Sequence, residues 1–457
     1  MSFIHAIFSG PSAQSYQDAF HAQDITSVWM RKAIQDWHNL YYQQEPTEQE
    51  DPCQQIPYTI VRRLSKAVFS EYAATSKDEF VRGILEALDA KKMEALQAAL
   101  IGGEAALKPI PGENGFRFTV VGRNNILVFG RDEYGNMTDI GTAETTASDR
   151  FYYTLLERRT VNAGGHLTLR NTLYQSETKE ILGRPVPLKT LPKYARLKDE
   201  YPFPKPVGSI GLARLITPMA NCVDGSADGV SVYAAAAGLI HSINRNEAQL
   251  NGEFDRGESR IITSADLLKK NRDGKRAFAD HLFVGLDDAP EDVGVTIFSP
   301  ALREQSFLAR KQEYLRNVES VIGLKRGLLS EVEAQERTAK EITSSEGDYN
   351  LTVIDFQQMW EKAAREAVRL CGVLGQMYHV PGAHEVAEDA VTIDWGNGVL
   401  YDEEKTWADY KSMVAAGLLK PEIALGWRFN MPTDTPAQLQ KIREKYMPEA
   451  TEGDGEE

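Results

Sequence analysis

Two helix-patterned segments on either side of a charged stretch, all within residues 299–370, constrain the fold of this chain most strongly. In the first segment, apolar side chains recur mostly at three- and four-residue spacing, which places them on one face of a helix; they are Phe307, Leu308, Tyr314, Leu315, Val318, Val321 and Ile322. Pro300 can begin this helix, because the amide that proline lacks falls among the unpaired donors of the first turn. The second segment has an apolar side made of Val353, Phe356, Trp360, Ala363, Ala367 and Leu370. The pattern predicts two long helices joined by a polar loop.

The remaining periodicities and turn residues predict a mixed α+β chain. One helix is expected from about Thr26 to Tyr42, with an apolar face made of Trp29, Ala33, Trp37, Leu40 and Tyr41. Asp228 is expected to cap another helix, from about Val230 to Phe254. Alternating and β-branched runs predict strands, and further helical runs flank them. Strands are expected over 116–121, 126–129, 151–161 and 166–174, within the segments RIIT, HLFVGL and GVTIF, and near 391–404, and helices over 58–72, 77–100, 406–425 and up to 446.

The net charge of −15 over 457 residues limits how this chain can treat nucleic acid. A protein that grips DNA by neutralising phosphates is normally basic, so this chain either never meets DNA or meets it without holding it. No run of about 18 apolar residues is present, so no membrane span or membrane partner is expected. Cys53, Cys222 and Cys371 lie far apart, which argues against a disulfide framework and against a cysteine-based zinc site.

No catalytic constellation is evident. The sequence contains no GxxxxGK[ST] phosphate loop, no GxSxG and no HExxH. Two groups contain residue types that bind metals, but a solvated loop fits each better than a site, because no further ligand is spaced to complete it; they are His379, His384, Glu385 and Glu388, and Asp287, Asp288, Glu291 and Asp292. We therefore expect no enzyme activity, no catalytic residue, no metal and no cofactor.

Four segments in a fixed order carry a resemblance to a known family. They are GVSVYAAAAGLIHSINRNEAQLNGEFDRGESRII, PALREQSFLARKQEYLRNVESVIGL, ERTAKEITSSEGDYNLTVIDFQQMWEKAAREAV and VTIDWGNGVLYDEE. With them the chain resembles, over roughly residues 25–445, the portal proteins of tailed bacteriophages, closest to the portal or minor capsid proteins of siphophages and of prophages in Gram-positive hosts. The resemblance implies a closed ring, typically a dodecamer, at one vertex of the capsid.

The resemblance also implies a division of the chain into parts. A portal subunit has a mixed α/β wing, a long-helix stem, a small α/β clip, a tunnel loop and a long helix behind that loop. Carried onto this chain, the parts are the wing at 1–228, the first stem helix at 229–258, the clip at 259–299, the second stem helix at 300–323, the tunnel loop at 324–340, the long helix at 341–385, a C-terminal wing or short crown region at 386–447, and an acidic tail, expected to be disordered, at 448–457.

Two candidate contact sites follow from the resemblance. The tunnel loop is expected to touch passing DNA without holding it, through Lys325, Arg326, Glu331, Glu333, Gln335, Arg337 and Lys340. The clip is expected to dock the terminase or an adaptor protein, through Lys269, Lys270, Arg272, Lys275 and Arg276. The tunnel-loop set mixes cations with acids, and this mixed polarity suits brief, reversible contacts with phosphates. The clip set belongs to a charged segment, Lys269 to Arg276.

The expected partners are those of a genome conduit. They are further copies of the chain, double-stranded DNA passing through the lumen for packaging and ejection, the large terminase subunit, a head-completion or adaptor protein at the head–tail connection, and the major capsid and scaffolding proteins. The expected location is the virion, and the host cytoplasm during assembly. Two alternatives remain: another head or tail structural protein without a DNA channel, and a nucleic-acid enzyme whose active site the motifs do not reveal.

Overall fold

The computed structural model describes residues 11–42, 52–113, 115–256, 260–263, 269–270, 276–277, 295–298, 302–331, 339–387, 390–396, 403–429, 431–433 and 435–447. For residue 256, for the strands between 260 and 298, and for residues 339–346 and 403–406, it describes the backbone alone. The chain divides into two compact units, one made of residues 1–68 and 74–392 and the other of residues 69–73 and 393–457. Among the described residues, no helix has both the length and the apolar character that a membrane crossing needs.

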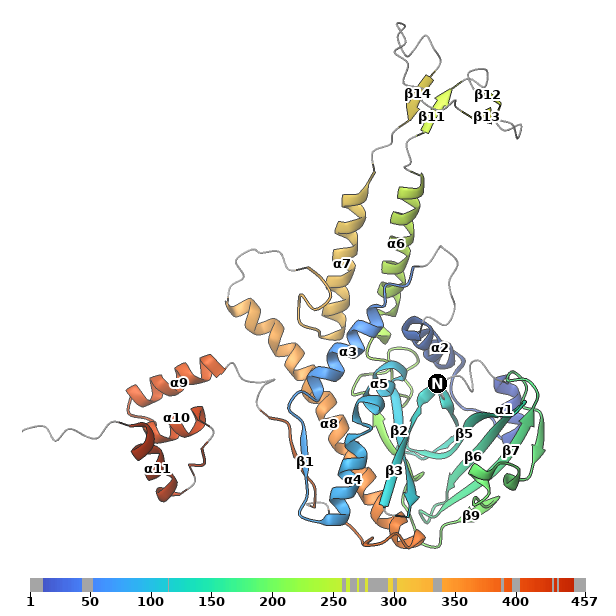
Figure 1. Cartoon of the computed structure of the whole chain (residues 1–457), viewed down its shortest axis with the longest axis horizontal. Helices are drawn as coiled ribbons and strands as arrows, with labels where there is room; N and C mark the ends of the chain where they lie inside the picture. Colours follow the sequence, from blue (N-terminus) through green and yellow to red (C-terminus); the bar gives the residue numbers. More distant parts are fainter. Residues whose placement is uncertain are drawn as a thin grey trace, which may run out of the picture. The chain divides into compact units, whose positions relative to one another are not determined.

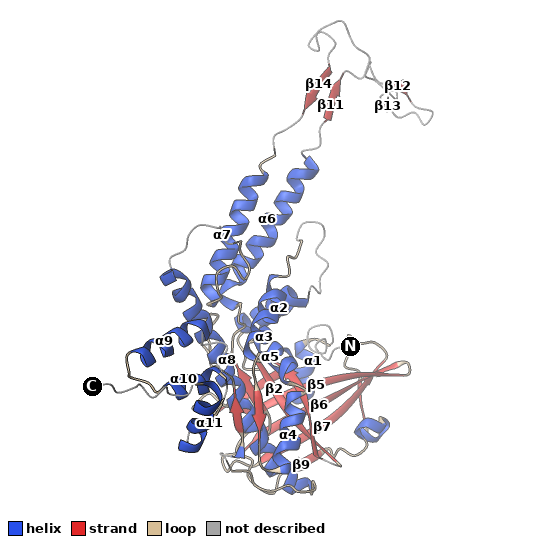
Figure 2. Ribbon diagram, turned by 60° about the vertical axis from the view of Figure 1, so that its left-hand side comes forward, coloured by secondary structure: helices blue, strands red, loops and turns tan. Residues whose placement is uncertain are grey.

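The larger unit contains an antiparallel sheet of six strands (Figures 1 and 2). Five strands follow in the order β4-β5-β6-β7-β8, and β9 pairs with β7. Their bounds are β4 (Ile126–Arg131), β5 (Met137–Ser148), β6 (Phe151–Val161), β7 (Leu167–Ser176), β8 (Arg184–Val186) and β9 (Glu200–Pro202). The predicted hairpin is therefore confirmed as β6 and β7, which pair from Tyr152↔Ser176 to Val161↔Leu167.

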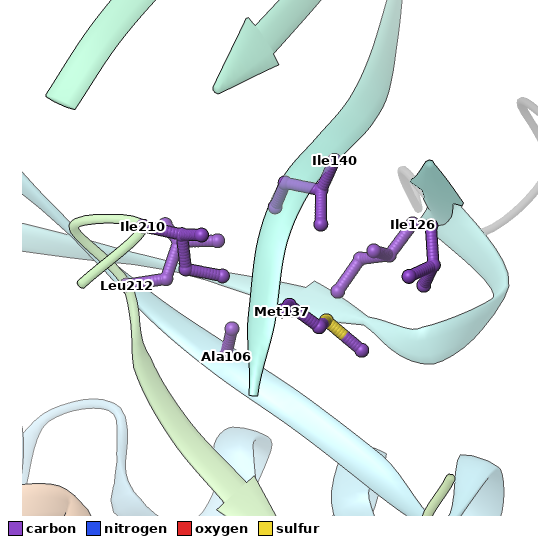
Figure 3. Close-up of a cluster of buried hydrophobic side chains, with 7 residues drawn as sticks. Ala106, Ile126, Met137, Ile140, Ile210 and Leu212 are labelled. Carbon is purple, nitrogen blue, oxygen red and sulfur yellow. The ribbon is translucent and has the colours of Figure 1, made fainter. Parts of the chain in front are cut away.

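Both faces of the six-stranded sheet are buried. On one face, Tyr16 and Phe20 of α1 (Ala13–Phe20) pack against Leu127, Ala143 and Leu156. Successive residues of a strand point to opposite faces, so the neighbours of Leu127 in β4 belong to a second cluster. Figure 3 shows this cluster, which is made of Ala106, Ile126, Val128, Met137, Ile140, Ile210 and Leu212. It connects the six-stranded sheet to a second, smaller sheet.

The smaller sheet is antiparallel, with strand order β10-β2-β3. Its strands are β10 (Ala213–Ile216), β2 (Glu104–Gly112) and β3 (Gly115–Gly122). Helices α4 (Glu79–Asp89), α5 (Lys92–Gly102) and the long helix α8 (Ala339–Tyr378) pack against it. The predicted apolar side of α8 is confirmed, because all six of its members are buried: Val353, Phe356, Trp360, Ala363, Ala367 and Leu370.

The N-terminal helices correct two expectations. They are α2 (Val28–Tyr42), α3 (Ile56–Val68), α4 (Glu79–Asp89) and α5. The single helix expected over 77–100 is two helices, and α4 starts at a cap in which Asp78 accepts from the amides of Phe80 and Val81. Trp29 was expected in the apolar face of α2, but it is 71 % exposed. The expected face is confirmed at Trp37 and Leu40, which are buried, but its first half is shifted by one residue, to Met30 and Ile34.

Helices α6 (Ala237–Arg256) and α7 (Glu304–Ile322) lie side by side in both views (Figures 1 and 2). The first begins later than expected, after the short 3-10 turn η5 (Ala234–Ala236), so Asp228 is not its cap. The apolar face expected for α7 holds only in part. Leu315, Val318 and Ile322 are buried, whereas Leu308 is 38 % and Val321 is 47 % exposed.

Between α6 and α7 the chain forms short antiparallel strands. β11 (Arg260–Thr263) pairs with β14 (Val295–Phe298), and β12 (Lys269–Lys270) pairs with β13 (Arg276–Ala277). The strands predicted in RIIT and GVTIF are confirmed, and the segment HLFVGL lies outside the described residues. A small α/β clip was expected here, and the described residues of this stretch form strands.

The smaller unit contains three helices in its described part, α9 (Glu403–Ala415), α10 (Pro421–Arg428) and α11 (Pro436–Tyr446). Thr435 and Gln438 form a reciprocal cap at the start of α11. Glu422 of α10 is nearly buried and pairs with Arg443 of α11. The chain passes between the units near β1 (Ala73–Thr75) and β15 (Thr392–Asp394), and the remaining 3-10 turns are η2 (Arg123–Asn125), η3 (Leu188–Thr190) and η4 (Pro192–Tyr194).

Candidate functional site: the α6–α7 helix pair and the turn after it

The segment that leads into α6 is fixed to the turn between α5 and β2. The amide of Val232 and the hydroxyl of Ser231 both donate to the carbonyl oxygen of Leu100, at 2.9 and 3.0 Å. Gly103 and Gly229 face each other so closely that a Cβ on Gly229 would lie 2.1 Å from the carbonyl oxygen of Gly103. Neither position has room for a side chain, so α6 starts from a rigid base.

A buried charge cluster holds the same segment to the six-stranded sheet. Asp228 Oδ1 accepts from Arg123 Nη2 at 3.0 Å and from Arg131 Nη2 at 2.7 Å. Arg123 Nη2 also donates to Thr26 Oγ1, at 2.9 Å. Buried charges are costly unless they are paired and hydrogen-bonded, so the cluster explains why Asp228 is used here and not as a helix cap. Asp228 lies about a hundred residues from both arginines in the sequence, and no local pattern could reveal the contact.

Ion pairs join α6 and α7 along their length. Lys311 Nζ lies 2.8 Å from Glu247 Oε2 and 3.0 Å from Gln54 Oε1. Nearer the other end of the pair, Arg303 contacts both carboxylate oxygens of Glu253, at 3.0 and 2.8 Å. A bidentate contact of this kind fixes relative position as well as charge. The two helices therefore have a defined register along each other.

The chain leaves α7 through a tight, closed turn. Gly323 has φ +78°, a left-handed conformation that glycine adopts without strain. The amide of Leu324 donates to the carbonyl oxygen of Glu319 at 2.8 Å. A Cβ on Gly323 would lie 2.7 Å from Thr352 Oγ1 of α8, so the turn also packs closely against that helix.

Glu319 anchors the residues that follow this turn. Its side chain is fully buried and accepts from the amides of Leu329 and Ser330 and from the hydroxyl of Ser330, the last two at 2.9 and 2.7 Å. The amide of Glu331 donates to Gln312 Oε1 of α7 at 2.9 Å. The start of the expected tunnel loop is thus folded back on α7. The sequence signal that was missed is an acid within the apolar stripe of Leu315, Val318 and Ile322.

The structure places part of the expected tunnel-loop set. Lys325 and Arg326 are adjacent, directly after the turn, with Lys325 half-buried and Arg326 exposed, and Glu331 is also exposed. Lys340 lies in the first turn of α8, where the backbone alone is described. The other members, Glu333, Gln335 and Arg337, lie outside the described residues. The DNA contact of this set remains a prediction.

The clip set is placed by its backbone. Lys269 and Lys270 form β12, and Arg276 begins β13, with Lys270 directly opposite Arg276 in the antiparallel pair. The pairing therefore brings two of the expected cations together. Arg272 and Lys275 lie outside the described residues, and docking through this set remains a prediction.

A histidine once considered as a metal ligand makes a structural bridge instead. His384 Nε2 lies 2.7 Å from Asp78 Oδ2, and its Nδ1 lies 2.9 Å from the carbonyl oxygen of Gly382. Both partners only accept, so both ring nitrogens must donate, and the hydrogen bond to Gly382 followed by the Asp78 carboxylate raises the pKa of His384 above its ordinary value. Among the described residues, no group of three or more metal-ligand side chains lies together. Glu388 and the acidic stretch from 287 to 292 lie outside the described residues.

Comparison with known proteins gives one family. A family model described as phage portal protein, SPP1 Gp6-like, matches residues 85–449. The matched range includes the six-stranded and three-stranded sheets, the α6–α7 pair, the anchored turn and α8. No curated protein matches the chain.

Proposed function

The chain belongs to the SPP1 Gp6-like family of phage portal proteins, and from this premise we propose that it forms a closed ring at one vertex of the capsid. The ring is the conduit for DNA packaging and ejection. Membership places the chain in a structural, not an enzymatic, family of the virion capsid. The proposal rests on the family match over residues 85–449. This range covers α6, α7, the turn after α7 and α8, which correspond to the expected stem helices, tunnel loop and long helix.

Exposed apolar side chains on the helix pair support assembly. A rotationally closed ring repeats one heterologous contact, so each copy needs two different, mutually complementary surfaces. On α6 and α7, Phe254, Leu308 and Val321 are each more than a third exposed. These side chains lie on helices that already bury other apolar residues against the body of the unit, so they are available to neighbouring copies.

The anchored turn supports a DNA contact by the loop. Glu319 fixes where the loop leaves α7, and Lys325 and Arg326 follow at once. Residues 324–339 have a formal charge of zero, from Lys325, Arg326 and Arg337 against Glu331, Glu333 and Glu336. Firm binding would require several uncompensated cations, because each phosphate contact adds affinity and salt dependence. A neutral loop suits brief contacts with moving DNA.

The protein itself supplies no chemical energy in this proposal. A separate ATPase, the large terminase subunit, docks on the clip through cations such as Lys270 and Arg276. After packaging, an adaptor protein binds to the clip in its place. Measurable ATP hydrolysis that persists through repeated purification of the chain would contradict this division of roles.

The test of the DNA contact separates assembly from packaging. Lys325→Ala with Arg326→Ala is expected to leave ring assembly intact and to change DNA packaging or DNA retention. Lys66→Ala with Arg82→Ala, two exposed cations of α3 and α4, is the control, because it removes the same charge elsewhere. Normal packaging and retention by rings of the first variant would show that the loop does not contact DNA.

A further inference from the structure

A pocket of about 340 Å³ lies between the start of α1, the first half of α2 and the start of β4. All of these elements belong to the larger unit. The pocket has an apolar lining to which each of the three elements contributes, made of Ala13, Val28, Ile34, Ile126 and Leu127. Ile34, Ile126 and Leu127 are themselves buried. The pocket is therefore an apolar hollow built on the packed body of the unit.

Two large apolar side chains are exposed where α2 begins. Val28, which lines the pocket, is 56 % exposed, and Trp29 is 71 % exposed. Lys32 also lines the pocket, and its Nζ lies 5.7 Å from the centre of the Trp29 ring. Exposed apolar groups beside a pocket are typical of a place where another chain segment binds. The pocket together with Val28 and Trp29 is called the α2 surface below.

The lining of the pocket includes a buried donor that lacks an acceptor. Arg123 lines the pocket and is only 3 % exposed. Its two terminal nitrogens donate to Ile126, Thr26 and Asp228, whereas its buried Nε donates to no residue that the structure describes. Buried donors in folded proteins nearly always find an acceptor. A peptide segment brings apolar side chains and, at every residue, a carbonyl oxygen that can accept.

Most charges of the pocket are already paired. Arg31 lies 3.4 Å from Asp24, and Arg123 lies 3.0 Å from Asp228. Lys32 is then the one cation of the lining that makes no ion pair with a described residue. Firm binding of DNA requires several uncompensated cations, so the pocket is poorly suited to nucleic acid. An uncharged, apolar segment matches this lining better than an ionic one.

Residues 1–10 of this chain have that chemistry. Their sequence, MSFIHAIFSG, contains no Asp, Glu, Lys or Arg. It places four large apolar side chains close together, at Phe3, Ile4, Ile7 and Phe8. Removal of such side chains from water is the main force that brings an apolar segment onto an apolar surface.

The described part of the chain begins beside the pocket. Pro11 is buried, and Ser12 caps α1 by accepting from the amide of Ser15 at 3.2 Å. Ala13, the first residue of α1, lines the pocket. Phe8 is five residues before Ala13, so at most about 18 Å of chain separates them. A short tether gives an effective concentration of about millimolar, which favours the segment of the same chain over that of a second copy.

We propose that residues 1–10 bind to the α2 surface of the same chain. Apolar side chains between Phe3 and Phe8 cover Val28 and Trp29, and a backbone carbonyl oxygen of the segment accepts from Arg123 Nε. The α2 surface is thus a peptide-binding site that the chain fills with its own first residues. The inference does not depend on the proposed ring, because every group in it belongs to one copy.

The test is hydroxyl-radical footprinting of Trp29 in the full chain, read by mass spectrometry, because a tryptophan ring is oxidised more slowly when it is covered. Ile7→Ser with Phe8→Ser is expected to raise the oxidation rate of Trp29 by about threefold or more, since a tethered segment covers its surface most of the time. Tyr134, which is 81 % exposed between β4 and β5, is the internal standard and should react equally in both chains.

A matched control removes apolar side chains elsewhere on the larger unit. Ile181→Ser with Leu197→Ser changes two exposed residues, and the oxidation rate of Trp29 should stay at the wild-type value. Unchanged circular dichroism and melting temperature establish that each variant is folded. The comparison is the same for single chains and for rings, so a failure of the proposed ring leaves this test intact.

A mixture of two variants identifies the copy that supplies the segment. The Ile7/Phe8 variant is mixed with an excess of Trp29→Ala chains, whose first ten residues are intact, so every Trp29 present belongs to a chain with an altered segment. Its oxidation rate is expected to stay high. A fall to the wild-type rate would assign the segment to a second copy and overturn the proposal. Equal Trp29 rates in the wild type and the Ile7/Phe8 variant would overturn it too, by showing that residues 1–10 do not cover the α2 surface.

Discussion

Glu157 connects the six-stranded sheet to the three-stranded sheet through charge. It is buried in β6, where Lys108 Nζ of β2 lies 2.8 Å away and Arg159 Nε lies 2.7 Å away. Arg159 also donates to the carbonyl oxygens of Ile210 and Gly211. Burial alone would raise the pKa of Glu157, but Arg159 and Lys108 outweigh it and lower that pKa to about 2. The carboxylate thus remains charged in the folded protein.

Replacing Glu157 with Gln is expected to lower the free energy of unfolding by roughly 3–5 kcal/mol at pH 7, because two cations lose a buried partner. The folded pKa is depressed, so the wild-type contribution is present above the unfolded pKa of 4.5 and disappears as the pH falls towards 2. Urea denaturation at pH 7 and pH 3 measures this, and the gap between wild type and variant should narrow at pH 3. Glu200→Gln, at an exposed pair with Arg170, is the control and should change little. An equal loss for both variants would contradict the argument.

For single residues, the sequence predicts burial where apolar residues repeat at helical spacing. The apolar side of α8, from Val353 to Leu370, was fully predictable because it repeats over several turns. Trp29 was not, because two neighbouring stripes of α2 have the same spacing and the packing partner decides between them. Asp228 pairs with Arg131 and Arg123, which lie 97 and 105 residues away in the sequence. Glu157 pairs with Lys108, which lies 49 residues away. No local sequence pattern covers such separations.

At the base of α6, Gly229 lies so close to Gly103 that there is no space for a side chain. Gly229→Ala is expected to lower the free energy of unfolding by roughly 1–3 kcal/mol or more, since the new Cβ would meet the backbone of Gly103. Gly238→Ala, in the first turn of α6, has nothing within 4 Å of the added Cβ. It is expected to be neutral or to stabilise by less than about 1 kcal/mol. Chemical denaturation of both variants compares them, and equal effects would show that the Gly103–Gly229 contact does not hold the segment.

The turn after α7 depends on one buried carboxylate. Glu319→Leu removes the acceptor for the amides of Leu329 and Ser330 while keeping the side chain apolar and of similar size. Amide exchange over residues 324–331 is expected to accelerate by about tenfold or more, because the local opening free energy falls with the lost hydrogen bonds. Hydrogen–deuterium exchange mass spectrometry measures this. Glu361→Gln, in a partly exposed pair with Arg365 on α8, should leave the rate unchanged, and an unchanged rate in Glu319→Leu would contradict the anchoring role.

The existence of the main helices could be predicted from the sequence, but some of their ends could not. The α6, α7 and α8 helices and the β6–β7 hairpin were predictable because periodicity and turn residues agree. The break between α4 and α5 was not, because Ala90 and Lys91 are good helix formers and the helix ends there for tertiary reasons. The start of α6 was placed too early, because Ser231, Val232 and Tyr233 before it are held by hydrogen bonds to Leu100 of α5 and Trp37 of α2. The anchored turn was missed because Glu319 reads as an ordinary helix residue.

The whole molecule combines a strongly acidic chain with a family whose members are portal proteins. A net charge of −15 keeps DNA from binding firmly to the protein as a whole. The cations expected to meet DNA or partners are confined to short segments near Lys325 and Lys270. Sequence alone could predict the family and the helix order, but not which face of the α6–α7 pair is open. The closed side is the one covered by Gln54, whose backbone amide donates to Asn244, 190 residues away in the sequence.

Negative-stain electron microscopy of the purified chain at micromolar concentration tests the central claim most directly, because a portal must be a ring with a passage. End-on views are expected to show closed rings with a central hole, assembled from copies of a 51.0 kDa chain. A number of copies other than twelve would agree with the account, since isolated rings can close with a different count. Particles of single chains, or compact assemblies without a central hole, would contradict it.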